Sequence, residues 1–279
     1  MKSIDGKVVA ITGAGSGIGR ALAELAAAKG ARLALSDIHK ANVDETAARC
    51  RAAGAEATAT KLDVADRAHV HRWADKTARD FGAVHVIINN AGVAISASVE
   101  KMEYADLEWL MNINFWGVVH GTKAFLPHLR AAGEGHVVNV SSVFGLVGIP
   151  TQSAYNASKF AVRGFTEALR EELDLLNCGV SATCVHPGGI RTNIANAARF
   201  GETEGIAGVT SKEASVGQMN KLLRIPPEVA ARKILTGIER NARRVLIGPE
   251  AYLIDAVQRS LPTAYQRILT SGSKLTQRL

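Results

Sequence analysis

The chain has 279 residues, of which 47% are hydrophobic. This hydrophobic content excludes a disordered protein, and it supports a sizeable core. Aromatic residues make up only 5%, so we expect a core built mainly from Ala, Val, Ile and Leu. No apolar run approaches the ~18 residues of a transmembrane helix. Met1 to Asp5 lack the apolar stretch of a signal peptide.

The net charge of +7 is unevenly distributed along the chain. Residues 221–279 hold 11 of the 33 basic and 4 of the 26 acidic residues, which accounts for the whole excess. Such a segment is more often a solvated face than a binding surface, and we favour that interpretation. An anionic substrate, an acidic partner or peripheral membrane contact is the less favoured alternative. Net charge is the sole argument for nucleic-acid binding, which we do not expect.

The three cysteines, Cys50, Cys178 and Cys184, have neither metal-ligand nor CxxC spacing. An odd number of widely separated cysteines is typical of reduced thiols. We therefore expect a cytoplasmic protein without disulfides and without a metal.

The N-terminal residues have the pattern of a βαβ unit. Lys7 to Thr12 form an apolar run typical of a buried strand, and a glycine-rich loop, Gly13 to Gly19, follows at once. Arg20 to Lys29 are rich in Ala and Leu and predict a helix that ends at Gly30, before a second strand from Arg32 to Ser36.

The glycine spacing predicts a site for a pyrophosphate. Gly-x-Gly-x-x-Gly is absent because Ile18 and Arg20 stand where a third glycine is needed, and no P-loop lysine follows. Gly13 still permits a sharp exit from the strand, Gly17 lets main chain approach an anion, and Gly19 allows close packing of helix on sheet. The helix N-terminus then offers free N–H groups.

Asp37 stands at the end of the second predicted strand. A carboxylate there accepts hydrogen bonds from the adenosine ribose and repels a 2′-phosphate, which favours NAD over NADP. Ile38 and His39 follow in place of an arginine that could neutralise the phosphate. The nearby Lys40 leaves NADP as the less favoured cofactor.

The alternation of strands and helices continues to about residue 250. We expect further strands over Glu56–Lys61, Val84–Ile88, Val137–Val140, Val180–Val185 and Val245–Ile247, and helices over Asn42–Ala53, Arg67–Phe81, Leu107–Leu129 and Tyr155–Leu176. This pattern predicts an α/β fold: one doubly wound parallel sheet of about seven strands with helices on both faces.

We interpret residues 1–279 as a single domain with two accessory segments. Residues 190–225 lose periodicity, and 200–217 are rich in Gly, Glu, Ser and Thr, which predicts a loop serving as a substrate lid. The basic extension over about 250–279 predicts a short amphipathic helix up to Tyr265 and then a tail that frays.

Tyr155 and Lys159 are four residues apart, so on a helix they share one face. A phenol that exchanges protons near neutral pH needs its pKa lowered by roughly three units, or about 4 kcal/mol. The lysine can supply part of this and a positively charged cofactor ring more. Upstream, Ser141 and Ser142 end the predicted strand at His136–Val140, where open α/β sheets bind ligands.

Together these residues resemble the short-chain dehydrogenase/reductase family, of the single-domain Rossmann type, over about residues 5–250. The resemblance is carried by the following motifs in the expected order: Thr12-Gly13-x-x-x-Gly17-x-Gly19, Asn89-Asn90-Ala91-Gly92, Asn114, Ser142, Tyr155-x-x-x-Lys159 and Pro187-Gly188. It implies a catalytic tetrad of Asn114, Ser142, Tyr155 and Lys159. Ser142 is preferred to Ser141 because it lies thirteen residues before Tyr155, the separation usual in the family.

The resemblance also implies a role for each member of the tetrad. Tyr155 is the general acid/base. Lys159 lowers the pKa of Tyr155 and binds the nicotinamide ribose. Ser142 hydrogen-bonds the carbonyl or alkoxide oxygen of the substrate. Asn114 positions a water that relays protons from Lys159 to bulk solvent.

A larger set is expected to bind the NAD cofactor. Asp63 is placed at the adenine, Asn90 over the adenosine ribose, and Ile190 and Thr192 at the carboxamide. The whole implied set is Gly13, Ser16, Gly17, Ile18, Gly19, Asp37, Asp63, Val64, Asn90, Ala91, Gly92, Tyr155, Lys159, Pro187, Gly188, Ile190 and Thr192. The resemblance further suggests a homotetramer or homodimer built on the helices around 107–129 and 155–176.

The residues expected around the substrate are apolar and favour a hydrophobic secondary alcohol or ketone, such as a steroid, retinoid, fatty or aromatic alcohol. They are Val93, Ala94, Ile95, Val143, Phe144, Val147, Ile149, Gly189 and the lid. The basic C-terminal segment leaves an acyl-carrier ketone open. Two alternative functions are a non-redox reaction on the same scaffold, by an epimerase, dehydratase or halohydrin lyase, and a non-catalytic dinucleotide-binding protein.

Three further polar residues could take part in the site. We interpret His186, before a proline at a strand end, as structural, and His120 as a helix-surface or interface residue. Arg191 could face substrate or form a salt bridge, and the sequence does not decide between the two.

Overall fold

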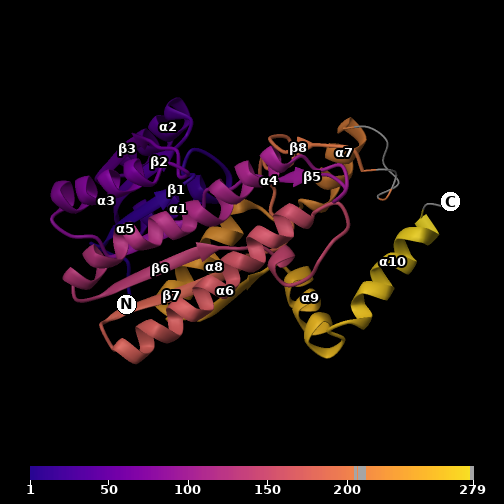
Figure 1. The fold of residues 1–279 in the computed structure, drawn as a ribbon. Helices are drawn as coiled ribbons and strands as arrows, with labels where there is room; N and C mark the ends of the chain where they lie inside the picture. Colours follow the sequence, from indigo (N-terminus) through magenta and orange to yellow (C-terminus); the bar gives the residue numbers. More distant parts are fainter. Residues whose placement is uncertain (204–205, 207–211, 277–279) are drawn as a thin grey trace.

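A computed structural model of the protein describes residues 1–203, 206 and 212–276. Its main strands are Val8–Thr12 (β1), Arg32–Asp37 (β2), Ala57–Lys61 (β3), Val86–Asn89 (β4), Gly135–Val140 (β6), Val180–Pro187 (β7) and Arg244–Ile247 (β9). These seven strands form one parallel sheet in the order β3-β2-β1-β4-β6-β7-β9 (Figure 1). The predicted Rossmann-type sheet is therefore confirmed, with its topological switch between β1 and β4.

Three helices pack on each face of the sheet. One hydrophobic cluster joins the strands to α1 (Gly17–Ala28), α2 (Lys40–Ala52) and α8 (Pro227–Glu239). The opposite cluster joins them to α3 (Arg67–Phe81), α5 (Gly117–Ala131) and α6 (Ser153–Leu176). Because both faces are covered, the strands lack the polar alternation of a half-exposed sheet.

Strand β1 illustrates why such a strand is apolar throughout. Its five residues are all buried. Val9 and Ile11 point into the cluster with α1 and α2, and Val8 and Ala10 point into the cluster with α3 and α5. Successive side chains point to opposite faces, so a polar residue at any of these four positions would lose its water.

Helix α3 begins and ends where local sequence signals predict. The side chain of Asp66 accepts a hydrogen bond from the main chain of His69 and caps the N-terminus. Gly82 adopts φ 77° just after the helix, a conformation that favours glycine. Both ends are therefore determined by contacts within a few residues, and the predicted bounds of 67–81 hold.

The long helix predicted over 107–129 differs in detail. It consists of α4 (Tyr104–Met111), a π-helical turn (Asn112–Trp116) and α5. A π turn adds one residue to a helical turn and often occurs at functional sites. Asn114, a predicted catalytic residue, lies fully buried within this turn.

The segment predicted as a lid is partly regular. Short strand β8 (Arg199–Phe200) pairs in parallel with β5 (Ile95–Ser96), and α7 spans Lys212–Leu222. The prediction of an irregular loop over 200–217 was therefore wrong for 212–217, and residues 204–205 and 207–211 lie outside the described residues. The pairing of β5 with β8 joins residues about 100 apart, which local periodicity cannot show.

The C-terminal segment also differs from its prediction. It forms two helices, α9 (Pro249–Ser260) and α10 (Ala264–Thr276), so the expected fraying just after Tyr265 is wrong. Figure 1 shows α10 projecting beyond the end of α9, away from the sheet. In the described part of the chain, no helix combines the length and apolar character needed to cross a bilayer.

His136 on β6 is a buried titratable residue, so its protonation should affect the stability of the fold. The residue is 1% exposed, and its Nε2 hydrogen-bonds Thr183 Oγ1 on β7 at 2.7 Å. Burial lowers the pKa of His136 to about 3. Below about pH 6.5 the unfolded chain therefore binds a proton that the folded protein excludes, and stability falls as the pH falls.

We predict that the free energy of unfolding decreases by up to about 1.4 kcal/mol per pH unit from pH 6.5 to 5 through this residue. Urea denaturation at several pH values measures it. His136→Gln, which cannot take up the proton, should flatten this dependence, whereas His71→Gln, at an exposed position on α3, should not. An unchanged slope in His136→Gln would contradict the prediction.

Candidate active site

The site begins where β6 ends. The main chain of Ser141 donates to Val185 of β7 at 2.8 Å, and the Ser141 hydroxyl donates to the carbonyl of Lys159 on α6 at 2.8 Å. Ser142 follows, with its Oγ accepting from the main-chain N–H of Phe144 at 3.1 Å. Ser141 thus ties the strand end to α6, and Ser142 is the first residue free to face the cleft.

Tyr155 and Lys159 lie on one face of α6, as their spacing predicts. The Ser142 side chain lies near the Tyr155 phenol and acts to lower its pKa. The Lys159 ammonium lies 5.5 Å from the centroid of the Tyr155 ring and donates to the carbonyl of Val140 at 3.0 Å. Phe144 packs edge-on against Tyr155, with 5.9 Å between ring centroids. The structure therefore brings together Ser142, Tyr155 and Lys159.

Burial disfavours the charged form of both titratable groups. It raises the pKa of Tyr155 to about 12, and the Ser142 side chain offsets part of that rise. It lowers the pKa of Lys159 to about 8. The protein groups alone thus do not make the phenol more acidic, and the groups that shift its pKa do not include Lys159, contrary to the expectation.

Asn114 belongs to the same cluster but is tightly engaged. Its Oδ1 accepts from the N–H of Val93 at 2.8 Å, and its Nδ2 donates to the carbonyl of Val93 at 2.9 Å and to Ser158 Oγ at 3.2 Å. The side chain thus joins the segment after β4 to α6. Both amide hydrogens thus serve protein acceptors. The role of Asn114 in a water relay stays a prediction.

The glycine loop is shaped by close approaches that no larger residue permits. Gly13 and Gly17 adopt φ of 65° and 52°, and a Cβ on Gly13 would lie 2.9 Å from Cα of Ala91. A Cβ on Gly19 would lie 2.1 Å from the carbonyl oxygen of Gly13. Ser16, at the N-terminus of α1, makes no side-chain capping hydrogen bond, so its hydroxyl is available to a ligand.

Asp37 lies beside this loop, as predicted. Its Oδ2 accepts from the N–H of Gly15 and its Oδ1 from the N–H of His39, both at 2.9 Å. Ile38 is 47% exposed. Lys40, which could have neutralised a 2′-phosphate, forms an ion pair with Asp44. The carboxylate is therefore held against the loop and has no basic partner among its described neighbours.

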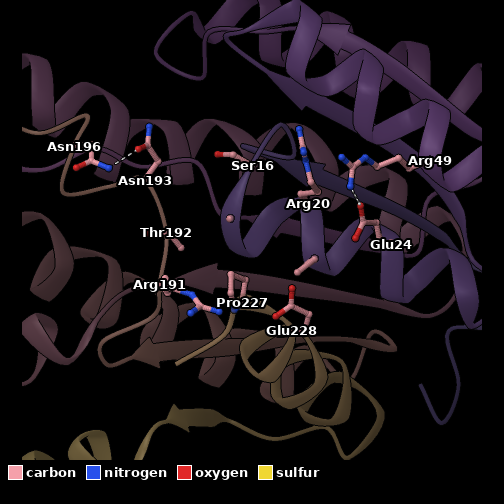
Figure 2. Close-up of a pocket in the computed structure, with 12 residues that line it drawn as sticks. Ser16, Arg20, Glu24, Arg49, Arg191, Thr192, Asn193, Asn196, Pro227 and Glu228 are labelled. Atoms are coloured by element: carbon pink, nitrogen blue, oxygen red, sulfur yellow. Dashed lines mark hydrogen bonds and ion pairs between the residues drawn. The ribbon is translucent and has the colours of Figure 1, made fainter. Parts of the chain in front are cut away.

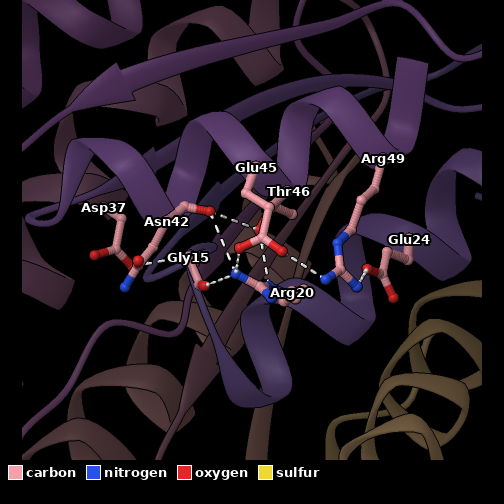
Figure 3. Close-up of polar contacts among 8 residues, drawn as sticks. All are labelled: Gly15, Arg20, Glu24, Asp37, Asn42, Glu45, Thr46 and Arg49. Carbon is pink, nitrogen blue, oxygen red and sulfur yellow. Dashed lines mark hydrogen bonds and ion pairs between the residues drawn. The ribbon is translucent and has the colours of Figure 1, made fainter. Parts of the chain in front are cut away.

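Arg20 is a residue of this region whose role the sequence did not reveal. Its guanidinium donates to the carbonyl of Gly15 at 2.7 Å, to Thr46 Oγ1 at 3.1 Å and to Glu45 at 3.0 Å (Figure 3). Gly15 is thus held on both sides, by Asp37 at its N–H and by Arg20 at its carbonyl. The partners on α2 come together only in the fold.

The other predicted cofactor residues lie around the same cleft. Asn90 directs its amide to the carbonyls of Thr12 and Gly13 at 3.0 and 3.2 Å, so the side chain supports the loop. The main chain of Gly92 lies between Asn114 and Lys159, since a Cβ there would be 3.3 Å from Asn114 Oδ1 and 3.6 Å from Lys159 Nζ. These contacts place the segment after β4 between the glycine loop and the tetrad.

The remaining predicted residues fall into two groups. Asp63 accepts from the N–H of Ala65 at 2.9 Å and Val64 packs against Gly117, both just after β3. Beyond β7, Ile190 is 4% exposed, and Thr192 lies directly over Gly17. Strands β3 and β7 lie on opposite sides of β1 in the sheet. The two segments that follow them therefore flank the glycine loop from opposite sides.

A cavity of about 390 Å³ opens beside the glycine loop (Figure 2). Its lining includes Ser16, Gly17 and Thr192 of the predicted cofactor set, together with residues of α1 and the first turn of α8. Arg191 lines its far side near Glu228, and no ion pair between the two is formed within 4.0 Å. Arg191 thus borders the cavity beside the glycine loop, which Tyr155 does not line.

Two residues from the C-terminal helices contact the site and were missed from the sequence. Glu250 on α9 accepts from the N–H of Gly189 at 2.7 Å. Tyr265 on α10 is 8% exposed, and its hydroxyl accepts from the N–H of Gly148 at 3.1 Å. Asn156, beside Tyr155, was also missed, and its amide donates to the carbonyls of Phe144 and Val147 at 2.7 and 2.8 Å.

Comparison with known proteins agrees with this geometry. The sequence model of the short chain dehydrogenase family matches residues 7–203. The putative oxidoreductase SadH of Mycobacterium tuberculosis is 46% identical over 273 residues, covering 98% of this chain and 97% of the relative. Human estradiol 17-beta-dehydrogenase 11 is 31% identical over 269 residues, covering 96% and 83% of the two chains.

A crystal structure also resembles this chain closely. A short chain dehydrogenase/reductase from Burkholderia phymatum, in complex with NAD, superimposes with a TM-score of 0.85 at 32% identity. The match covers 93% of this chain and 95% of that one. With the parallel sheet, the glycine loop and the clustered Ser142, Tyr155 and Lys159, these similarities show that the chain belongs to the short-chain dehydrogenase/reductase family of oxidoreductases.

Proposed function

We propose that the protein interconverts a hydrophobic secondary alcohol and its ketone with a nicotinamide dinucleotide, NAD in preference to NADP. The observation that carries this proposal is the placement of the Ser142 side chain near the Tyr155 phenol, where it acts to lower the pKa of the phenol, beside the Lys159 ammonium. Two hydroxyl groups that meet at one point can bind a single substrate oxygen. One of them can then exchange its proton with that oxygen while the other stabilises the charge.

The residues around the glycine loop fit a dinucleotide. The uncapped start of α1 and the free Ser16 hydroxyl suit a pyrophosphate, and Asp37 at the end of β2 suits a ribose diol. Tyr155 and Lys159 lie beyond the segment after β4, whose Ala91 contacts the glycine loop and whose Gly92 lies beside Lys159. The nicotinamide would be held there by Ile190 and Thr192. When bound, the cofactor supplies or accepts the hydride.

In the proposed reaction Tyr155 takes the hydroxyl proton of an alcohol during oxidation and returns it during reduction. Burial raises the pKa of Tyr155 to about 12, so proton removal depends on positive charge near the phenol. Lys159 provides one such charge, and its commitment to the carbonyl of Val140 keeps the ammonium in place. Ser142 hydrogen-bonds the substrate oxygen and orients it toward the phenol.

The surroundings of Tyr155 support an apolar substrate. Its ring packs against a cluster formed by Ile95, Leu110 and Ala154. The predicted pocket residues Ala94, Ile95, Val143 and Val147 have apolar side chains and are each less than 7% exposed. They therefore bring no charged group to the surroundings of Tyr155. The name of the estradiol dehydrogenase relative supports a bulky alicyclic alcohol as one class to test.

We also propose a homotetramer or homodimer built on the helices that the sequence indicated. Trp116 in the π turn is 48% exposed and Phe160 on α6 is 41% exposed. Trp116 stacks on His120 with 6.1 Å between ring centroids. Large aromatic side chains on neighbouring helices suit a subunit interface, which analytical ultracentrifugation would reveal.

One prediction concerns the role of the Tyr155 phenol. Tyr155→Phe should reduce turnover at least about 10³-fold, because the proton then has no acceptor, while the dissociation constant for NADH changes less than about threefold. Stopped-flow absorbance of the reduced cofactor measures turnover, and fluorescence titration measures binding. Tyr104→Phe, at a position that is 83% exposed, is the control and should retain activity. Substantial turnover by Tyr155→Phe would refute the proton-transfer role.

Another prediction concerns the choice between NAD and NADP. Asp37→Ala with Ile38→Arg should raise the affinity for NADPH relative to NADH at least about tenfold, because repulsion is lost and a cation is gained. Asp37 also holds Gly15, so Asp37→Asn is needed as a control that keeps an acceptor there. It should weaken NADH binding without creating a preference for NADPH. An unchanged ratio in the double variant would exclude Asp37 from cofactor recognition.

A further inference from the structure

His186 lies on β7 directly behind the serine at the end of β6. Its Nδ1 is 2.9 Å from the carbonyl oxygen of Ser142, and the residue is completely buried. A carbonyl oxygen can only accept, so Nδ1 carries the proton in this contact. The sequence analysis predicts a structural role for His186, and the structure shows that its partner is a residue of the proposed tetrad.

The hydrogen bond lies just beyond the end of the main-chain ladder. Strands β6 and β7 pair in parallel up to Val140 and Val185, and Ser141 then donates to Val185 at 2.8 Å. In a parallel ladder the next donor on β7 would be residue 187, to the carbonyl of Ser141, but residue 187 is Pro187 and has no N–H. The main-chain ladder to β7 therefore ends at Ser141, and the imidazole of His186 supplies the next contact between the two strands, at the carbonyl of Ser142.

The imidazole is held in one form and makes no other hydrogen bond. Nε2 has no hydrogen-bond partner in the described structure. Burial lowers the pKa of His186 to about 4, so the ring is neutral at pH 7 and carries a single proton. The charged groups that act on it are Arg244 from β9 and Arg163 and Glu167 from α6. The single donated proton is directed to Ser142.

Two contacts then define the position of the Ser142 peptide. Its carbonyl accepts from Nδ1 of His186 and from the N–H of Gly145 at 2.9 Å. The second contact belongs to the turn over 143–145, which Asn156 holds to α6 rather than to the sheet. His186 is the contact that fixes this peptide to the sheet, and so the direction in which the hydroxyl points toward Tyr155.

We infer that His186 is a positioning residue, which orients the Ser142 hydroxyl toward the substrate oxygen by a hydrogen bond to the Ser142 carbonyl. The inference rests on the proposed function of Ser142. Small displacements of a group that orients substrate can lower turnover about 10²-fold. Loss of the bond should therefore lower kcat and leave cofactor binding intact.

Kinetics of three variants test this role. His186→Leu, which has no donor, should lower kcat 10- to 100-fold, with the Kd for NADH within twofold of the wild type. His186→Asn, whose amide can donate from nearly the same place as Nδ1, should restore kcat to within threefold. Val185→Ala removes buried volume at the neighbouring position on β7 and should retain kcat. An equal loss in His186→Asn, or full activity in His186→Leu, would overturn the inference.

A measurement on the wild-type protein covers the case in which His186→Leu does not fold. In protein with ¹⁵N-labelled histidine, the ring whose signals are absent from the spectrum of His186→Asn identifies His186, and NMR at pH 7 should show it protonated at Nδ1 with a bare Nε2. If that ring were instead protonated at Nε2, the inference would be overturned, because Nδ1 could not then donate. The tautomer does not depend on turnover, so a wild type inactive on every alcohol would refute the proposed function alone.

Discussion

The active-site arrangement depends on how helix α6 is fixed to the end of strand β6. Two hydrogen bonds make this junction, Ser141 to the carbonyl of Lys159 and Lys159 to the carbonyl of Val140, and the Ser142 side chain lies near that of Tyr155. Gly145 allows the approach, because a Cβ there would lie 2.7 Å from the carbonyl oxygen of Lys159. Helix and strand are thus close enough for a residue from each to bind the same substrate oxygen.

Burial at this junction has opposite effects on structure and chemistry. It makes the hydrogen bonds of Lys159 and Asn114 strong and their loss costly, which keeps the site rigid. It also raises the pKa of Tyr155 and lowers that of Lys159, which opposes the ionised forms. A site of this kind becomes an efficient base only when further positive charge enters it, so the proposed chemistry is linked to cofactor binding.

The C-terminal helices extend the site beyond the segment that the family model matches. That match ends at residue 203, yet Glu250 holds Gly189 just after β7 and Tyr265 holds Gly148 beside the predicted substrate pocket. Both contacts join a side chain to a glycine N–H, so they fix main chain without occupying the cleft. This basic C-terminal segment therefore has a structural role at the site.

The sequence by itself determined the seven-stranded sheet, the approximate bounds of the helices up to α6 and, through the family resemblance, the identity of the clustered residues, whereas α7, α8 and α10 were not predicted. Apolar runs, the glycine loop, Asp66 and Gly82 act within a few residues, so their effect can be deduced from the chain alone. Only the tertiary structure decided what those residues touch: His186 on Ser142, Arg20 on Gly15 and Glu250 on Gly189. Two of these contacts join residues at least 44 positions apart, and Arg20 also reaches α2. Such pairings depend on how whole elements pack, which neither local spacing nor hydrophobic periodicity specifies.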